Sequence, residues 1–147
     1  MTWENESTLK IDTDAGQQTR RFLFDPARKQ PSGPATLQGH SFAEWERPAA
    51  GGRGGAGAAP PPPGGTMKAL TTNLRGGWLR KNGVPYSANA TVTEYYDRFA
   101  APNGDQWLVV TTIVADPMYL AQDFVTSTHF KKEADAAKWA PAACKGT

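Results

Sequence analysis

The sequence predicts an all-β protein of 147 residues, an antiparallel β-barrel or sandwich of about seven or eight short strands in a single domain. Three observations predict this class. Apolar and polar residues alternate with a period of two in several segments. An Asn-Gly pair at 103–104 separates two runs of β-branched and aromatic residues. Glycine and proline interrupt the remaining segments at short intervals, which argues against a long helix.

The first half of the chain predicts a hairpin followed by a third strand. Residues 8–13 alternate apolar and polar side chains, a turn signal follows at 14–16, and an extended run resumes over 19–24. Residues 25–34 are rich in turn-forming residues. The next predicted strand covers 36–46, with Leu37, Ser41, Ala43 and Trp45 on one face.

Residues 47–66 form a Gly/Ala/Pro-rich insert, which we interpret as a loop. The insert holds 7 of the 15 glycines and 5 of the 12 prolines. We expect it to join the strands 36–46 and 67–72 as an elongated hairpin connection, with a short polyproline II rod at 60–63. Its two arginines account for the net charge of +2, since the rest of the chain has 14 basic and 14 acidic residues. This balance argues against a nucleic-acid-binding protein.

The second half predicts a long hairpin and a final strand. Residues 73–89 are irregular and contain several Gly and Pro residues. The runs 91–99 and 107–115 flank the Asn-Gly connection, and their composition favours strands. A last strand is expected over 124–131. Residues 133–139 are expected to form one or two helical turns.

The composition also excludes several classes of protein. No apolar stretch approaches the roughly 18–20 residues of a membrane-spanning helix. The first six residues lack the basic and apolar regions of a signal peptide, which predicts a cytoplasmic protein or a mature or truncated form. Cys144 is the only cysteine, so an internal disulfide and a cysteine-rich zinc site are excluded.

Several separated motifs within residues 36–130 carry a family resemblance. In chain order they are Gly39-His40-Ser41, Glu44-Trp45-Glu46, Leu70-Thr71-Thr72-Asn73-Leu74, Trp78-Leu79-Arg80-Lys81-Asn82-Gly83-Val84-Pro85, Thr93-Glu94-Tyr95-Tyr96-Asp97-Arg98 and Ile113-Val114-Ala115-Asp116-Pro117. Together they resemble a widespread group of uncharacterised bacterial proteins, usually exported, that share the patterns G-x-S … W-E-G-D-T-L-x-V-x-T-T, T-E-x-(F/Y)-x-R and x-x-D-P. The chain departs from these patterns at 47–66, where the insert replaces a short turn. The resemblance implies an architecture and a periplasmic or secreted location, but no chemistry.

Glu94, Tyr96 and Arg98 are the candidate catalytic residues, because they share one face of a predicted central strand. If that face lines a cavity, burial would make Glu94 a candidate general acid or base. The alternative is a structural ion pair, in which Arg98 neutralises Glu94.

His40, Glu44 and Glu46 share a strand face and, with His129, are the candidate metal ligands. The alternative is a half-solvated polar face, because the spacing is generic and the opposite face carries Ala43 and Trp45. The sequence favours the alternative, and no cofactor is predicted.

Five aromatic residues on or beside predicted strands are candidate ligand-binding residues. Aromatic side chains pack in β-sheet cores, and they also line ligand cavities. The five are Trp45, Trp78, Tyr86, Tyr96 and Trp107.

These observations leave three functions open. The first is binding of a small apolar or aromatic ligand in a barrel cavity. The second is a cavity enzyme, either cofactor-independent or metal-dependent. The third is structural self-assembly, in which copies of the chain form a homo-oligomer. A cavity larger than about 300 Å³ with Glu94 or His40 in its wall would favour the first two.

Overall fold

The computed structural model describes residues 1–14, 16–46, 65–79 and 83–143. Within these ranges the chain forms ten β-strands and two short 3₁₀ helices, which confirms the predicted all-β class. The predicted loop lies outside the described residues over 47–64, and so does the predicted polyproline II rod.

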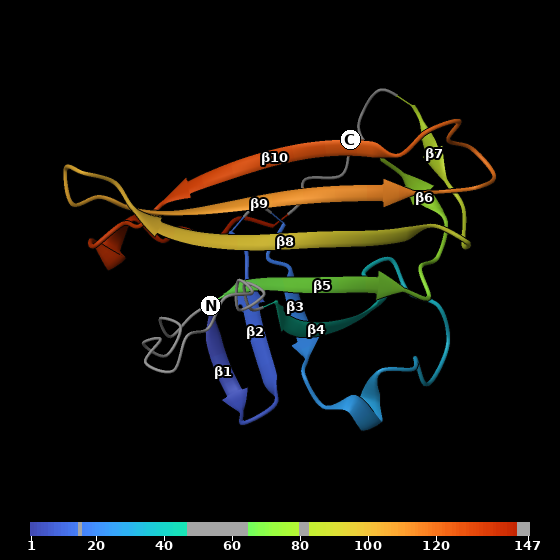
Figure 1. Cartoon of the computed structure of the whole chain (residues 1–147), viewed down its shortest axis with the longest axis horizontal. Helices are drawn as coiled ribbons and strands as arrows, with labels where there is room; N and C mark the ends of the chain where they lie inside the picture. The colour runs from blue at the N-terminus through green and yellow to red at the C-terminus, as the bar shows by residue number, and fades with distance from the viewer. Residues whose placement is uncertain (15, 47–64, 80–82, 144–147) are drawn as a thin grey trace, which may run out of the picture.

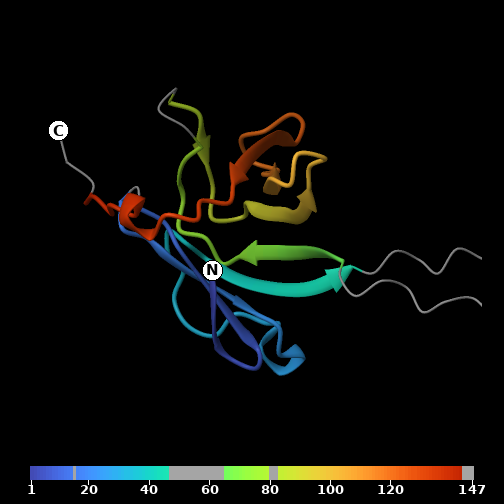
Figure 2. The ribbon, with the colours of Figure 1, turned by 90° about the vertical axis from the view of Figure 1, so that its left-hand side faces the viewer.

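Eight strands form one curled sheet in the order β1-β2-β3-β4-β5-β8-β9-β10. In Figure 1 the antiparallel strands β8, β9 and β10 lie side by side along nearly the same line, whereas β1 to β3 cross them steeply. Figure 2 shows the same curl from the side, as a half-barrel. The eight strands are β1 Thr2–Asn5, β2 Thr8–Asp12, β3 Thr19–Leu23, β4 His40–Glu46, β5 Thr66–Thr72, β8 Thr91–Ala100, β9 Gln106–Ala115 and β10 Phe124–Lys131.

The predicted hairpins are confirmed by the strand register. β2 pairs with β3 from Thr8↔Leu23 to Asp12↔Thr19, and β8 pairs with β9 along its whole length. β4 and β5 are antiparallel and end at the pair Glu46↔Thr66, so the insert does connect two neighbouring strands.

One pair of strands departs from the predicted antiparallel arrangement. β3 and β4 run parallel, with Phe22 opposite Ser41 and Leu23 opposite Phe42. The connection over 24–39 contains the 3₁₀ helix η1, Pro26–Arg28, and returns the chain to the end of the sheet where β3 began. Parallel strands need such a crossover, whereas a tight turn joins only antiparallel ones. The sheet is therefore mixed.

Other differences lie at the margins of the predicted elements. β1 was not predicted, and the irregular segment 73–89 contributes a separate two-stranded sheet of β6, Gly77–Trp78, and β7, Pro85–Tyr86. The predicted helical turns near the C-terminus are limited to one 3₁₀ turn, η2, Ala136–Lys138. The predicted strand over 36–46 begins only at His40.

Gly39 lies directly before that strand, at a position that leaves no room for a side chain. Its φ is +65°, and a Cβ atom built on it would lie 2.5 Å from the carbonyl oxygen of Thr72 and 2.8 Å from Leu74 Cδ2. A side chain is disfavoured at positive φ and meets backbone here. We expect Gly39→Ala to lower the free energy of unfolding by about 2 kcal/mol, measured by urea denaturation.

Gly104 is the matched control for this substitution. Its φ is +86°, but nothing lies within 4 Å of an added Cβ. Gly104→Ala should therefore show the conformational cost alone, about 1 kcal/mol. Equal losses for the two variants would contradict the proposed contact at Gly39.

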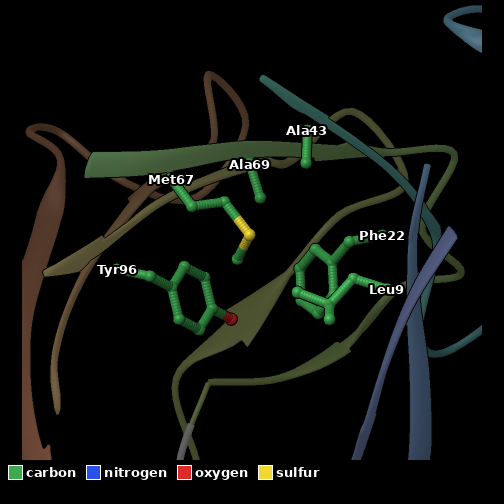
Figure 3. Packing of buried hydrophobic residues seen from close by; sticks show 6 residues of the cluster. All are labelled: Leu9, Phe22, Ala43, Met67, Ala69 and Tyr96. Atoms are coloured by element: carbon green, nitrogen blue, oxygen red, sulfur yellow. The ribbon is translucent and has the colours of Figure 1, made fainter. Parts of the chain in front are cut away.

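The hydrophobic core lies on the concave face of the sheet. Side chains of β2, β3, β4, β5 and β8 converge there, and Phe22 is fully buried. Its ring meets the Tyr96 ring edge-on with the centroids 5.5 Å apart, and Figure 3 shows the Met67 side chain extending toward both rings. The buried cluster consists of Leu9, Phe22, Ala43, Met67, Ala69 and Tyr96.

Candidate functional site

The central strand β8 places two polar side chains on this apolar face. Glu94 and Tyr96 are 6% and 8% exposed. They share a face because side chains of a strand alternate between its two sides. Opposite Glu94 lie Ala69 of β5 and Thr112 of β9. A carboxyl group in such a place needs a partner.

Arg20 of β3 is the partner of Glu94. Its Nη1 donates to Glu94 Oε1 at 2.9 Å and its Nη2 donates to Oε2 at 2.6 Å, which is a bidentate pair. Nη2 also lies 3.4 Å from Thr71 Oγ1, which shares a hydrogen bond of 2.7 Å with Ser41 Oγ. The Arg20 guanidinium stacks over the Phe22 ring, 4.8 Å from its centroid. Four strands thus contribute to one polar network in the core.

The surroundings of this network shift the pKa values of Tyr96 and Arg20. Burial raises the pKa of Tyr96, and the neighbouring Glu94 carboxylate raises it further. Burial alone would lower the pKa of Arg20, but its bonds to Glu94 outweigh that and raise the pKa. Tyr96 therefore carries a hydroxyl hydrogen at neutral pH, and Arg20 keeps its charge.

A cavity of about 510 Å³ opens beside the network, inside the half-barrel. Arg20, Glu94 and Tyr96 line one part of its wall. The rest of the exposed wall area is mainly apolar. Its further polar residues are Asp12, Thr13, Asp14, Thr112 and Thr128. The apolar wall is formed by Met1, Ile11, Leu108, Val110, Phe130 and Trp139.

A smaller cavity of about 240 Å³ lies on the other side of Arg20. Arg20 lines both cavities, so its side chain belongs to the wall between them. Thr71 also lines the smaller cavity, and the β6–β7 sheet contributes Trp78 and Tyr86.

The catalytic candidates are only partly brought together. Glu94 and Tyr96 lie side by side in the wall of the large cavity, as their shared strand face predicts. Arg98 is exposed, and the partner of Glu94 is Arg20, so the predicted pairing of Glu94 with Arg98 is wrong. Arg20 lies 74 residues from Glu94 in the chain, and its position in the sequence carries no signal of this contact.

Three of the five aromatic candidates line a cavity, and Trp45 and Trp107 line neither of the two. Tyr96 lines the large cavity, and Trp78 and Tyr86 line the small one. Trp107 packs near His129, 5.8 Å between ring centroids. Trp45 stacks on Phe24 at 5.6 Å and lines neither cavity.

The metal candidates are not brought together. Nε2 of His40 lies 2.8 Å from the carbonyl oxygen of Arg28, in the wall of a separate surface hollow of about 450 Å³. Glu46 forms an ion pair with Lys68, and Glu44 is exposed. Within the described ranges, no three His, Cys, Asp or Glu side chains converge on a possible metal position.

Sequence reasoning missed most of the large cavity. Arg20, Ile11 and Trp139 come from elements that the sequence assigned only as strand or helical turn. The run of apolar residues in β9 was a usable signal, because Leu108 and Val110 share its inward face with Thr112. No pattern in the sequence indicated that β2, β9 and β10 surround one space.

Among the described residues, no helix is long and apolar enough to cross a membrane. Comparison with known proteins adds no further assignment. No protein-family model, curated protein or solved structure matches the chain.

Proposed function

We propose that this protein binds a small, neutral, mainly apolar molecule that carries one hydrogen-bonding group. The observation that carries the proposal is the cavity of about 510 Å³ with the Arg20–Glu94 pair in a mainly apolar wall. Ligand sites are typically cavities of about 300–1,000 Å³ with few polar groups among apolar ones. The cavity has this size and this distribution of groups.

The ion pair favours a neutral ligand. Arg20 and Glu94 cancel each other's charge in a bidentate arrangement. An anionic ligand would compete with Glu94 for the guanidinium, and a cationic one would compete with Arg20 for the carboxylate. Either exchange leaves a buried charge without its partner, which is costly. A hydroxyl or carbonyl group can instead use the remaining donors and acceptors of the pair or of Tyr96.

The same pairing favours binding over acid–base catalysis. Both oxygens of Glu94 accept hydrogen bonds from Arg20, and Tyr96 remains protonated because its pKa is raised. A general base needs an available lone pair and a proton affinity suited to neutral pH. The periplasmic or secreted location implied by the family resemblance remains a prediction.

Fluorescence titration with N-phenyl-1-naphthylamine, a neutral apolar probe, tests this function. We expect saturable binding of one probe per chain. Thr128→Trp should weaken that binding at least about tenfold, because Thr128 lies in the cavity wall and a bulky ring there fills the cavity. Since Thr128 is exposed, the fold should tolerate the substitution.

Val125→Trp is the matched control. Val125 lies on the same strand, is 59% exposed and faces away from the cavity. It should leave the affinity for the probe unchanged. Absence of saturable binding by the unaltered chain, or equal weakening in both variants, would overturn the proposed function.

A further inference from the structure

The segment 132–143, termed here the strap, crosses the side of the large cavity. It begins at the end of β10, where Lys132 N donates to the carbonyl oxygen of Gln106 at 2.8 Å. It ends at the β2–β3 turn, where Ala142 N donates to the carbonyl oxygen of Asp14 at 3.0 Å and Gly16 N donates to that of Ala142 at 2.9 Å. Figure 2 shows this red segment beside the blue ends of β2 and β3.

The strap presents one aromatic side chain to the cavity. Trp139 follows η2 directly and lines the cavity together with Ile11 of β2 and Phe130 of β10. Asp135 caps the 3₁₀ turn by accepting from Ala137 N at 3.0 Å, and Lys138 pairs with Glu133 at 2.6 Å. These local contacts hold the turn that carries the tryptophan.

The strap is attached more weakly than the rest of the cavity wall. Its described residues are all exposed, and Trp139 is 53% exposed. The other wall residues belong mainly to strands paired along their length, such as β9 and β10. A segment held by a few exposed backbone hydrogen bonds opens at a small fraction of the cost of global unfolding.

We propose that the strap is the movable wall of the ligand cavity, and that Trp139 is its ligand-contacting residue. Release of Ala142 from the β2–β3 turn gives the ligand access between β10 and β2. Re-formation of the two backbone hydrogen bonds returns Trp139 to the cavity. This inference rests on the proposed function, because it assigns the access route and one contact residue of the same site.

Ala142→Pro is the test of the movable wall, because proline lacks the N–H that donates to Asp14. Stopped-flow mixing with N-phenyl-1-naphthylamine should show association and dissociation both faster by about fivefold, the factor that corresponds to the loss of one hydrogen bond of about 1 kcal/mol. Ala143→Pro is the matched control, since no hydrogen bond involves the backbone N–H of Ala143 in the described part of the chain. It should leave both rates unchanged.

A second pair of variants tests Trp139. We expect Trp139→Ala to weaken probe binding about tenfold and Trp139→Phe to restore most of the affinity, because the aromatic contact is retained. Urea denaturation should show that all four variants remain folded. Saturable binding by the unaltered chain, combined with unaltered rates in Ala142→Pro or unaltered affinity in Trp139→Ala, would overturn the strap proposal alone. Absence of binding by the unaltered chain would overturn the proposed function with it.

Discussion

Arg20→Met is expected to lower the free energy of unfolding by about 3 kcal/mol, near the low end of the range for a broken buried ion pair. The substitution leaves the Glu94 carboxylate, whose side chain is 8% exposed, without its bidentate partner. The loss is moderated because the Arg20 side chain is 25% exposed and water can reach the site. For a chain of this size the melting temperature should fall by about 6–12 °C, measured by calorimetry.

The origin of this loss can be tested by a second substitution. Adding Glu94→Leu to Arg20→Met should recover much of the stability, because it removes the unpaired buried carboxylate. A double variant no more stable than the single one would contradict an unpaired-charge origin.

Arg21 provides the control beside Arg20. It makes an equally bidentate pair with Glu4 at 2.8 and 2.9 Å, but on the exposed side of β3. Exposed ion pairs contribute little to stability. Arg21→Met should leave the melting temperature almost unchanged, which separates the effect of burial from the effect of hydrogen-bond geometry.

Phe22→Ala is expected to cost about 4 kcal/mol of unfolding free energy. Phe22 is fully buried and contacts the Tyr96 ring edge-on, and the Arg20 guanidinium stacks over its face. Removal of the ring leaves a cavity and also removes the surface on which Arg20 rests. Urea denaturation measures the loss, and Phe22→Leu should show a smaller one because most of the volume is retained.

Phe99→Ala is the control for the loss of a phenyl ring. Phe99 lies near the end of β8 and is 50% exposed. Its removal creates no internal cavity, so the expected loss is below about 1 kcal/mol. Similar losses for Phe22→Ala and Phe99→Ala would show that the concave face is not the stabilising core.

Most strands were predictable because their signals are local. The alternation over 8–13 and the Asn-Gly pair at 103–104 depend on neighbouring residues alone, and both predicted hairpins form. β1 was missed because its four residues are all exposed. A strand with no buried face needs no alternation of apolar and polar residues. The parallel pairing of β3 with β4 was missed because the route of the connection over 24–39 is not a local property.

The site was predictable only in part, because some of its contacts are local in the sequence and others are not. Glu94 and Tyr96 share a strand face, which the period of two already requires, and both line the cavity. Arg98 lies on the same face of β8 by the same period, but it is exposed near the end of the strand. The partner of Glu94 comes from β3 instead, and such a pairing depends on how distant strands meet.

Local sequence patterns were enough to predict the all-β class, the hairpins, the position of the Gly/Ala/Pro-rich insert and the placement of Glu94 and Tyr96 on one strand face. These properties follow from the side-chain period of a strand and from the backbone preferences of Gly, Pro and Asn. The pairing of Glu94 with Arg20, and the cavity surrounded by β2, β9, β10 and Trp139, depend on the tertiary structure. The curl of the sheet and the crossover between β3 and β4 bring together residues that lie far apart in the sequence. Local sequence patterns do not report such contacts.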